Sequence, residues 1–207
     1  MMGKNISSNG AFAIKSKDIF VYDQSDCTRG AIDNMKNLYP NRYYDKKEDI
    51  PVEQYYEQGY RGILFDIDNT LVPHDEPVDE AARVFVKKLK ELGFGICLIS
   101  NNDEERVRTF ADPLEVSYVY KAWKPKREGY EQGMQILGTD VSNTLFVGDQ
   151  IFTDVWGARR AGVFSILIDP INPKEEIQII LKRIPEKFIK WNYRRKHHLK
   201  KGEYDRQ

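Results

Sequence analysis

The sequence has little of what marks several classes of protein. Its 207 residues include two cysteines, Cys27 and Cys97, too few for a disulfide framework or a cysteine-based metal site. No apolar run approaches the length of a membrane-spanning helix, and the first residues are polar without a signal-peptide core. The formal net charge is zero, which argues against general nucleic-acid binding by the whole body. We therefore expect a cytoplasmic protein whose partners do not include nucleic acid.

What the sequence does contain is enough apolar material for one sizeable domain. Hydrophobic residues make up 41% and charged residues 31%, as in soluble globular proteins. We divide the chain into a polar, mobile N-terminal extension over residues 1–35, a domain over residues 36–190 and a basic tail over residues 191–207. The tail continues a wider basic segment, because ten basic and three acidic residues lie between Lys182 and Gln207.

One buried strand dominates the pattern. The apolar run 63–65 follows a glycine and leads directly into Asp66 and, two residues later, Asp68. Short apolar runs bounded in this way are typical of fully buried strands in parallel sheets. Four more strands, with helices between them, are predicted at residues 94–99, 116–120, 144–147 and 164–168. Strands that alternate with helices predict a three-layer, Rossmann-like α/β fold with a five-stranded parallel sheet.

The pattern also predicts several helices and their ends. Residues 52–58 are interpreted as a short helix that ends at Gly59, and the tyrosines around it are expected to pad the sheet. Gly93 and Pro113 are expected to end the helices before and after the second strand. Near the C-terminus, apolar residues recur at helical spacing at Ile177, Ile180, Leu181, Ile184, Phe188 and Trp191. We expect the first half of this helix to pack on the sheet, a kink at Pro185, and the basic cluster on the second half.

Polar side chains gather where the predicted strands end. They are Asp66 and Asp68, Ser100 and Asn101, Lys121 and Lys124, and Asp149 and Asp154. Because the carboxyl ends of parallel strands meet at one edge of a sheet, we expect these side chains to converge. Carboxylates as close as Asp66 and Asp68 repel each other unless a cation or a proton lies between them. Carboxylate oxygens suit Mg²⁺ and a lysine suits a phosphoryl group, so the residues predict both at this edge.

Four short motifs carry a resemblance to a known superfamily. Residues 66–71, Asp-Ile-Asp-Asn-Thr-Leu, resemble motif I of the haloacid dehalogenase (HAD) superfamily. Ser100-Asn101 resembles its motif II, Lys124 its motif III, and Gly148-Asp149 with Asp154 its motif IV. The strings 68–73, 99–102 and 147–154 are similar to those of the YqeG family of subclass IIIA phosphatases. The resemblance spans residues 37–190 and implies a HAD core.

The resemblance implies a nucleophile, an acid/base and a metal site. Asp66 would attack phosphorus and form an aspartyl-phosphate intermediate. Asp68 would protonate the leaving alcohol and then activate a water molecule. Mg²⁺ would be held by the Asp66 carboxylate, the Asp68 backbone carbonyl and Asp149, with Asp154 as a direct or water-mediated ligand.

The resemblance also implies a phosphate site. Ser100 and Lys124 would bind the phosphoryl oxygens, and Thr70 and Asn101 would complete this site and fix its geometry. Lys124 is preferred as the phosphate lysine because a Lys-Pro pair at the head of a helix matches the family pattern. Lys121 stays open as the alternative.

The short spacing between the motifs leaves no room for a cap domain, so we expect an open site. An open site favours a substrate whose bulk is held elsewhere, and the family resemblance implies a phospholipid headgroup, that of phosphatidylglycerophosphate. The basic tail would then contact the inner face of a membrane peripherally. Two alternatives stay open. One is a phosphatase for a soluble nucleotide or sugar phosphate, and the other is a non-catalytic module, a phospho-accepting receiver or an RNA- or ribosome-binding protein that uses the tail.

Overall fold

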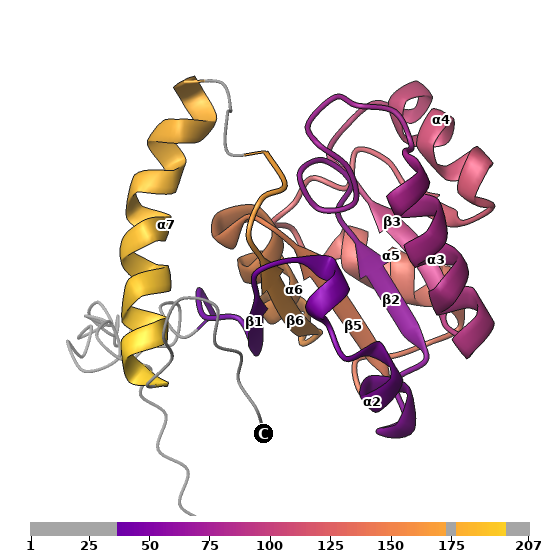
Figure 1. Cartoon of the computed structure of the whole chain (residues 1–207), viewed down its shortest axis with the longest axis horizontal. Helices are drawn as coiled ribbons and strands as arrows, with labels where there is room; N and C mark the ends of the chain where they lie inside the picture. Colours follow the sequence, from indigo (N-terminus) through magenta and orange to yellow (C-terminus); the bar gives the residue numbers. More distant parts are fainter. Residues whose placement is uncertain (1–36, 173–176, 198–207) are drawn as a thin grey trace, which may run out of the picture.

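The protein is a three-layer α/β structure built on one parallel sheet (Figure 1). In this computed structural model, residues 37–172 and 177–197 are described, with the side chains of the last segment described from Glu186 onward. The predicted N-terminal extension and the end of the basic tail lie outside these residues. The six strands are, in sheet order, β1 (Arg42–Tyr44), β6 (Phe164–Ile168), β5 (Thr144–Gly148), β2 (Gly62–Phe65), β3 (Gly95–Ile99) and β4 (Ser117–Val119).

The predicted fold class is confirmed, with one strand more than the five predicted. The additional strand is β1, which pairs in parallel with β6 through the register Arg42↔Ile166. Its three residues begin with a charged one and show no apolar run, and Pro40 lies two residues before them. Tyr43 and Tyr44 are both 4% exposed, so these two tyrosines belong to the sheet itself rather than padding it from outside.

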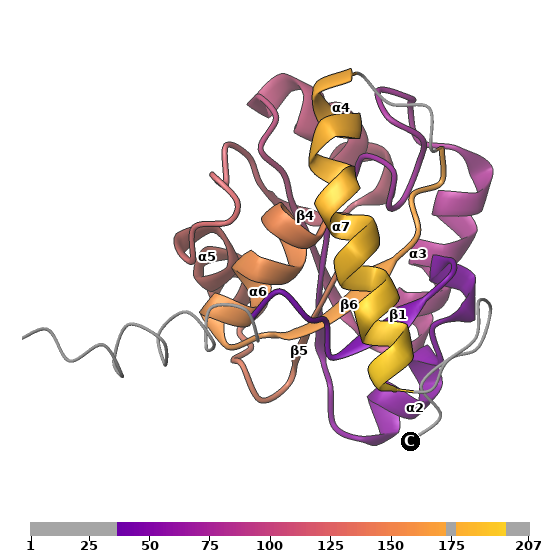
Figure 2. The same ribbon diagram turned by 90° about the vertical axis from the view of Figure 1, so that its left-hand side faces the viewer.

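Helices cover both faces of the sheet (Figures 1 and 2). One face packs against α2 (Val52–Glu57), α3 (Glu80–Leu92) and α4 (Glu104–Leu114). The other face packs against α5 (Glu128–Leu137), α6 (Trp156–Ala161) and α7 (Ile177–Lys196). Successive strand residues point to opposite faces, so that in β2 Phe65 joins the first core cluster and Leu64 the second.

Helix ends follow local chemistry, with one exception. The Asp79 side chain caps α3 by accepting a hydrogen bond from Ala82 N, and Gly93 ends that helix with φ 98°, as predicted. Pro113 does not end α4, because the helix continues to Leu114. Leu114 is 5% exposed, and its packing in the core holds the last turn in place through the proline.

Helix α7 is described only in part, because the side chains of its first half, which we predicted to pack on the sheet, lie outside the described residues. It is one helix from Ile177 to Lys196 that runs through Pro185 and continues past residue 190, where we had divided domain from tail. The second half packs against the domain, since Tyr193 is 2% exposed and Glu186 accepts a hydrogen bond from Ile151 N at 2.9 Å. No helix within residues 37–172 and 177–197 has the length and hydropathy needed to cross a membrane.

Candidate active site

Two central strands deliver the acidic residues. Asp66 follows β2, and its backbone N–H donates to Val147 O of the adjacent strand β5 at 3.0 Å. Asp149 follows β5 directly, and Asp154 lies in a π-helical turn, η2 (Ile151–Val155), that leads into α6. Gly148 makes the close approach possible, because a Cβ atom there would lie 2.6 Å from Asp154 Oδ2.

Asp66, Asp149 and Asp154 form a buried acidic cluster around the Lys124 ammonium group. Each aspartate offers a carboxylate oxygen, and these oxygens lie within 4.8 Å of one another. The three residues are 7%, 0% and 1% exposed, in that order. Lys124 Nζ donates to Asp66 Oδ1 at 2.5 Å and to Asp154 Oδ1 at 2.7 Å. The structure thus brings together four of the residues predicted from strand ends.

The electrostatics of the cluster favour an additional positive charge. Burial, together with the neighbouring Asp154 and Asp149, raises the pKa of Asp66 well above its usual value, although Lys124 opposes this. Burial alone would lower the pKa of Lys124, but the carboxylates of Asp154 and Asp66 outweigh it and raise that pKa. Two of the three carboxylates, those of Asp66 and Asp154, therefore share one ammonium group, and the third lies close to them. Their oxygens are the donor type that Mg²⁺ prefers, so the residues fit a divalent cation.

The structure places Lys124, and not Lys121, in the cluster. The Asn101 side chain holds the Lys124 backbone, accepting from Lys124 N at 2.6 Å and donating to Lys124 O at 3.2 Å. Lys121 instead pairs with Asp103 at 3.0 Å, and its side chain is 52% exposed. Lys121 and Trp123 both have left-handed backbone conformations, with φ 44° and 53°. Such strain in non-glycine residues is concentrated at functional sites, and here it turns the chain so that Lys124 points inward.

Ser100 and Thr70 are buried beside these groups. Ser100 is 3% exposed, and its Oγ accepts a hydrogen bond from Asn102 N at 3.1 Å. Thr70 is fully buried, and its Oγ1 has no hydrogen-bond partner among the described residues. A buried hydroxyl without a partner is costly, so it has a hydrogen bond to offer to a bound group or a water molecule.

The Asp68 side chain lies apart from the acidic cluster. Asp68 Oδ2 accepts from Asn102 Nδ2 at 2.7 Å, and Oδ1 accepts from Arg106 Nη2 at 3.0 Å and from Asp75 N at 3.1 Å. Burial would raise the pKa of Asp68, but the hydrogen bonds from Asp75, Arg106 and Asn102 outweigh it and lower the pKa. The possible metal ligands that lie within 4.8 Å of its carboxylate are His74 and Asp75, and not the aspartates of the acidic cluster.

Arg106 and Asn102 are site residues that the sequence reasoning missed. Arg106 lies in the first turns of α4 and also donates to Glu76 O at 3.0 Å, so it ties the loop after β2 to that helix. Because Arg106 lies inside a helix, it is not among the polar residues at strand ends from which the site was predicted. Asn102 lay next to the Ser-Asn pair and could have been found by the same reasoning, since it directly follows two assigned residues.

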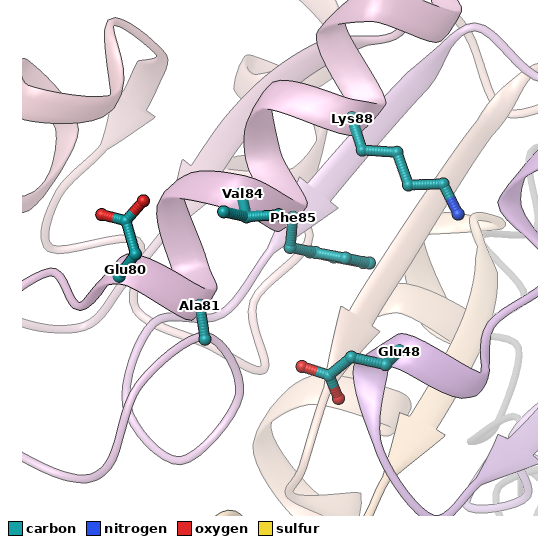
Figure 3. Close-up of a pocket in the computed structure, with 6 residues that line it drawn as sticks. All are labelled: Glu48, Glu80, Ala81, Val84, Phe85 and Lys88. Atoms are coloured by element: carbon teal, nitrogen blue, oxygen red, sulfur yellow. The ribbon is translucent and has the colours of Figure 1, made fainter.

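Two surface hollows lie outside the acidic cluster. One hollow of about 360 Å³ lies between α3 and the short helix η1 (Lys47–Asp49), and Val84, Phe85 and Glu48 are among the residues that line it (Figure 3). Another, of about 490 Å³, is lined by residues of α4 and by Tyr120 and Lys121. Neither includes a residue of the acidic cluster. A single helix joins β2 to β3, and another joins β3 to β4, which leaves no cap domain at these two connections.

Comparisons with known proteins agree with this geometry. A sequence profile of haloacid dehalogenase-like hydrolases matches residues 73–162. The chain is 30% identical over 165 residues to the probable phosphatase YqeG of Bacillus subtilis, which covers 79% of this chain and 96% of that protein. It is 25% identical over 133 residues to phosphatidylglycerophosphate phosphatase 1, chloroplastic/mitochondrial, of Arabidopsis thaliana, covering 59% of this chain and 38% of that protein.

Two further similarities are more limited. The 5'-nucleotidase YutF of Bacillus subtilis is 47% identical over 45 residues, which is 22% of this chain and 18% of that protein. The cobalt-bound deoxy-D-mannose-octulosonate 8-phosphate phosphatase of Haemophilus influenzae superposes with a TM-score of 0.45 at 13% identity, over 56% of this chain and 70% of that one. This TM-score is too low to define the fold, which is defined by the sheet order described above.

Proposed function

The chain belongs to the haloacid dehalogenase-like hydrolases and is a phosphatase of that family; from this premise we propose that it hydrolyses phosphomonoesters through an aspartyl-phosphate formed on Asp66. The observation that carries the proposal is the buried acidic cluster of Asp66, Asp149 and Asp154 around Lys124. Lys124 contacts two buried carboxylates, and a third lies within 4.8 Å of them, so the described residues hold more negative than positive charge here; uncompensated buried charge destabilises a fold. A site for a cation and a phosphoryl group explains the excess.

In the first step, Asp66 is the nucleophile. One Asp66 oxygen forms a bond to phosphorus while the ester bond to the leaving oxygen breaks, and the alcohol leaves with a proton from Asp68, which must react in its protonated form despite its lowered pKa. Lys124, held against Asp66 by the Asn101 clamp on its backbone, orients the attacking carboxylate and stabilises charge on the phosphoryl oxygens. Ser100 and the Thr70 hydroxyl, which has no partner among the described residues, would complete the phosphate site.

In the second step, water replaces Asp66 on phosphorus. Asp68 takes a proton from the water as its oxygen bonds to phosphorus and the bond to Asp66 breaks, releasing inorganic phosphate. A divalent cation, which we propose to be Mg²⁺ held by Asp66, Asp149, Asp154 and the Asp68 carbonyl, would neutralise charge between carboxylate and phosphate. The carboxylate donors and their burial support this assignment.

We propose a phospholipid phosphomonoester, of the phosphatidylglycerophosphate type, as the substrate. The relative from Arabidopsis thaliana carries that substrate in its name, and single-helix connections leave this site without a cap to enclose a small molecule. A peripheral position on a membrane, to which the basic tail would contribute, belongs to the same proposal. The partial match to a 5'-nucleotidase favours a soluble nucleotide as the second candidate.

The test is phosphate release from phosphatidylglycerophosphate in mixed micelles, measured with Mg²⁺ or with EDTA, for the wild type and for Asp66→Asn. We expect metal-dependent release that the substitution abolishes. Turnover of a nucleoside monophosphate or p-nitrophenyl phosphate without release from the lipid would keep the chemistry and reject the lipid substrate. A rate for Asp66→Asn equal to that of the wild type would reject Asp66 as the nucleophile.

A further inference from the structure

The outward side of α7 carries an exposed aromatic pair. Phe188 is 66% exposed and Trp191 53% exposed, and their ring centroids lie 5.8 Å apart. These residues are the last two of the apolar repeat in the sequence, and we predicted that they belong to the half of the helix that carries the basic cluster. The inward side of the same helix instead presents Glu186 and Tyr193, which are 3% and 2% exposed. Apolar surface that is not used for folding is available for a partner.

The helix is fixed in this orientation by contacts that leave the aromatic pair free. Glu186 accepts from Ile151 N at 2.9 Å, and Lys190 Nζ donates to Asp169 at 2.9 Å. Tyr193 packs on Tyr43 of β1, with ring centroids 6.4 Å apart. Turning Phe188 and Trp191 inward would break all of these contacts, so the exposure of the pair is a property of the docked helix.

The exposed charges next to the pair are cationic. Lys187 and Arg195 are exposed and lie one helical turn on either side of Trp191. The Arg195 guanidinium group lies 5.4 Å from the Trp191 ring centroid. In the described side chains of α7, the single acidic residue is Glu186, which is buried under the helix. We call Lys187, Phe188, Trp191 and Arg195 the outer face of α7.

We infer that the outer face of α7 docks on an anionic lipid bilayer. Aromatic side chains flanked by lysine and arginine are the composition of helices that lie in the membrane interface, where the rings enter the headgroup region and the cations meet lipid phosphates. A second copy of this chain fits the surface less well, because a symmetric contact would set Lys187 and Arg195 against their own copies. The sequence-based hypothesis assigned membrane contact to the basic tail as a whole, Phe188 and Trp191 included; the inference narrows it to the outer face, because Tyr193 is 2% exposed and packs inward.

The position of α7 relates the bilayer to the catalytic edge. The segment between β6 and α7 touches the loop that carries the nucleophile, because Ile171 N donates to Asn69 O at 3.1 Å and Asn172 N to Asn69 Oδ1 at 3.3 Å. From that edge α7 runs along the β1 side of the sheet (Figures 1 and 2). The outer face lies on the second half of α7, which leads away from that edge, so a membrane against it would lie along the β1 side of the sheet. The inference rests on the proposed function in that the lipid substrate would come from this membrane, although binding itself needs no turnover.

The experiment is cosedimentation of the full chain with phosphatidylcholine vesicles that contain or lack phosphatidylglycerol. We expect the wild type to bind the anionic vesicles alone. The double variant Phe188→Ala/Trp191→Ala is expected to bind them at least about tenfold more weakly. Lys187→Gln/Arg195→Gln is expected to weaken binding at low salt and to have little effect at high salt. The matched control is Trp123→Ala, which removes a tryptophan that is 66% exposed beyond the opposite edge of the sheet.

Four results would overturn the inference. The wild type would fail to bind anionic vesicles, or the double aromatic variant would bind them as tightly as the wild type does. Trp123→Ala would weaken binding as much as the double variant does, or the wild type would form a dimer without lipid that the double variant does not form. Hydrolysis of p-nitrophenyl phosphate keeps this test separate from the proposed function. The double variant is expected to match the wild type on that ester, which also shows that it folds. A wild type that hydrolyses no ester would contradict the proposed function and leave the vesicle result standing.

Discussion

Two aspartates at the carboxyl ends of parallel strands, Asp66 after β2 and Asp169 after β6, contact a lysine in similar ways but have opposite pKa shifts. Asp66 is almost completely buried and shares Lys124 with Asp154, so burial and its acidic neighbours raise its pKa. Burial would also raise the pKa of Asp169, but Lys190, the Tyr43 hydroxyl and Arg194 outweigh it, and the pKa is lowered.

The difference separates a site built for a ligand from one built for stability. Asp169 has two cations and a phenol for one carboxylate, with Lys190 Nζ at 2.9 Å and Arg194 Nη2 at 3.9 Å, and it anchors α7 to the sheet. In the acidic cluster, Lys124 is the cation that the described residues supply, and it contacts two of the three carboxylates. We attribute the excess negative charge to the cation that we propose the site binds, and buried charge of this kind costs the fold stability.

The largest effect is expected from Lys124→Ala, which removes the single cation of the acidic cluster. Activity should fall by about 10²- to 10³-fold, the usual loss for a group that stabilises transition-state charge. Stability of the metal-free protein should fall by about 3 kcal/mol, because the remaining charges are buried and unpaired. Steady-state kinetics and urea unfolding measure the two effects. The control is Lys121→Ala, whose exposed side chain should matter little to either; a larger loss there would make Lys121 the phosphate lysine.

Arg106→Ala should lower kcat/KM by about 10- to 100-fold, because Arg106 and Asn102 position the Asp68 carboxylate. The loss should be larger for an alkyl phosphate than for p-nitrophenyl phosphate, since a poor leaving group depends more on a well-placed acid. If Arg106 had a merely structural role, kcat/KM would fall equally for both substrates. Arg106→Lys, which keeps a donor for Asp68, should recover part of the activity. Arg108→Ala, on the exposed side of the same helix, is the control.

Asp66→Asn should make the metal-free protein more stable, by about 0.5–2 kcal/mol, while it removes activity. The folded state holds the Asp66 proton more tightly than the unfolded state does, so wild-type stability falls as pH rises through the raised pKa. The advantage of the variant should therefore grow with pH. Urea unfolding in EDTA at several pH values measures it. Equal wild-type and variant stability across that range would show that the cluster is not strained.

Asp169→Asn should show the opposite sign and the smallest effect, a loss of about 1 kcal/mol or less because the carboxylate is partly exposed and screened. The lowered pKa means that its contribution is present above the usual aspartate value and is lost as pH falls through the folded-state value. The difference between variant and wild type should thus disappear in acid. Thermal unfolding from neutral pH to below pH 4 tests this, and a variant equal to the wild type at neutral pH would contradict it.

Much of the fold and part of the site followed from local patterns. Strands β2 to β6, the glycine that ends α3 and the strand-end acids were predictable because burial on both faces requires unbroken apolar runs and because parallel strands share an edge. Strand β1 was not, since its three residues begin with a charged one and show no apolar run. The position of Arg106 was not either, because it depends on how α4 packs beside the loop that carries Asp68.

The sequence by itself determined the parallel sheet and the chemistry at its edge, because both are properties of short segments: apolar runs, and the acids and lysine that follow them. Only the tertiary structure decided which lysine enters the cluster and which side of α7 is buried. Lys124 is selected by the distant Asn101, and the inward side of α7 by Ile151, Asp169 and Tyr43. Helical spacing shows that Phe188 and Trp191 share a face, but contacts from other elements decide that this face is turned outward.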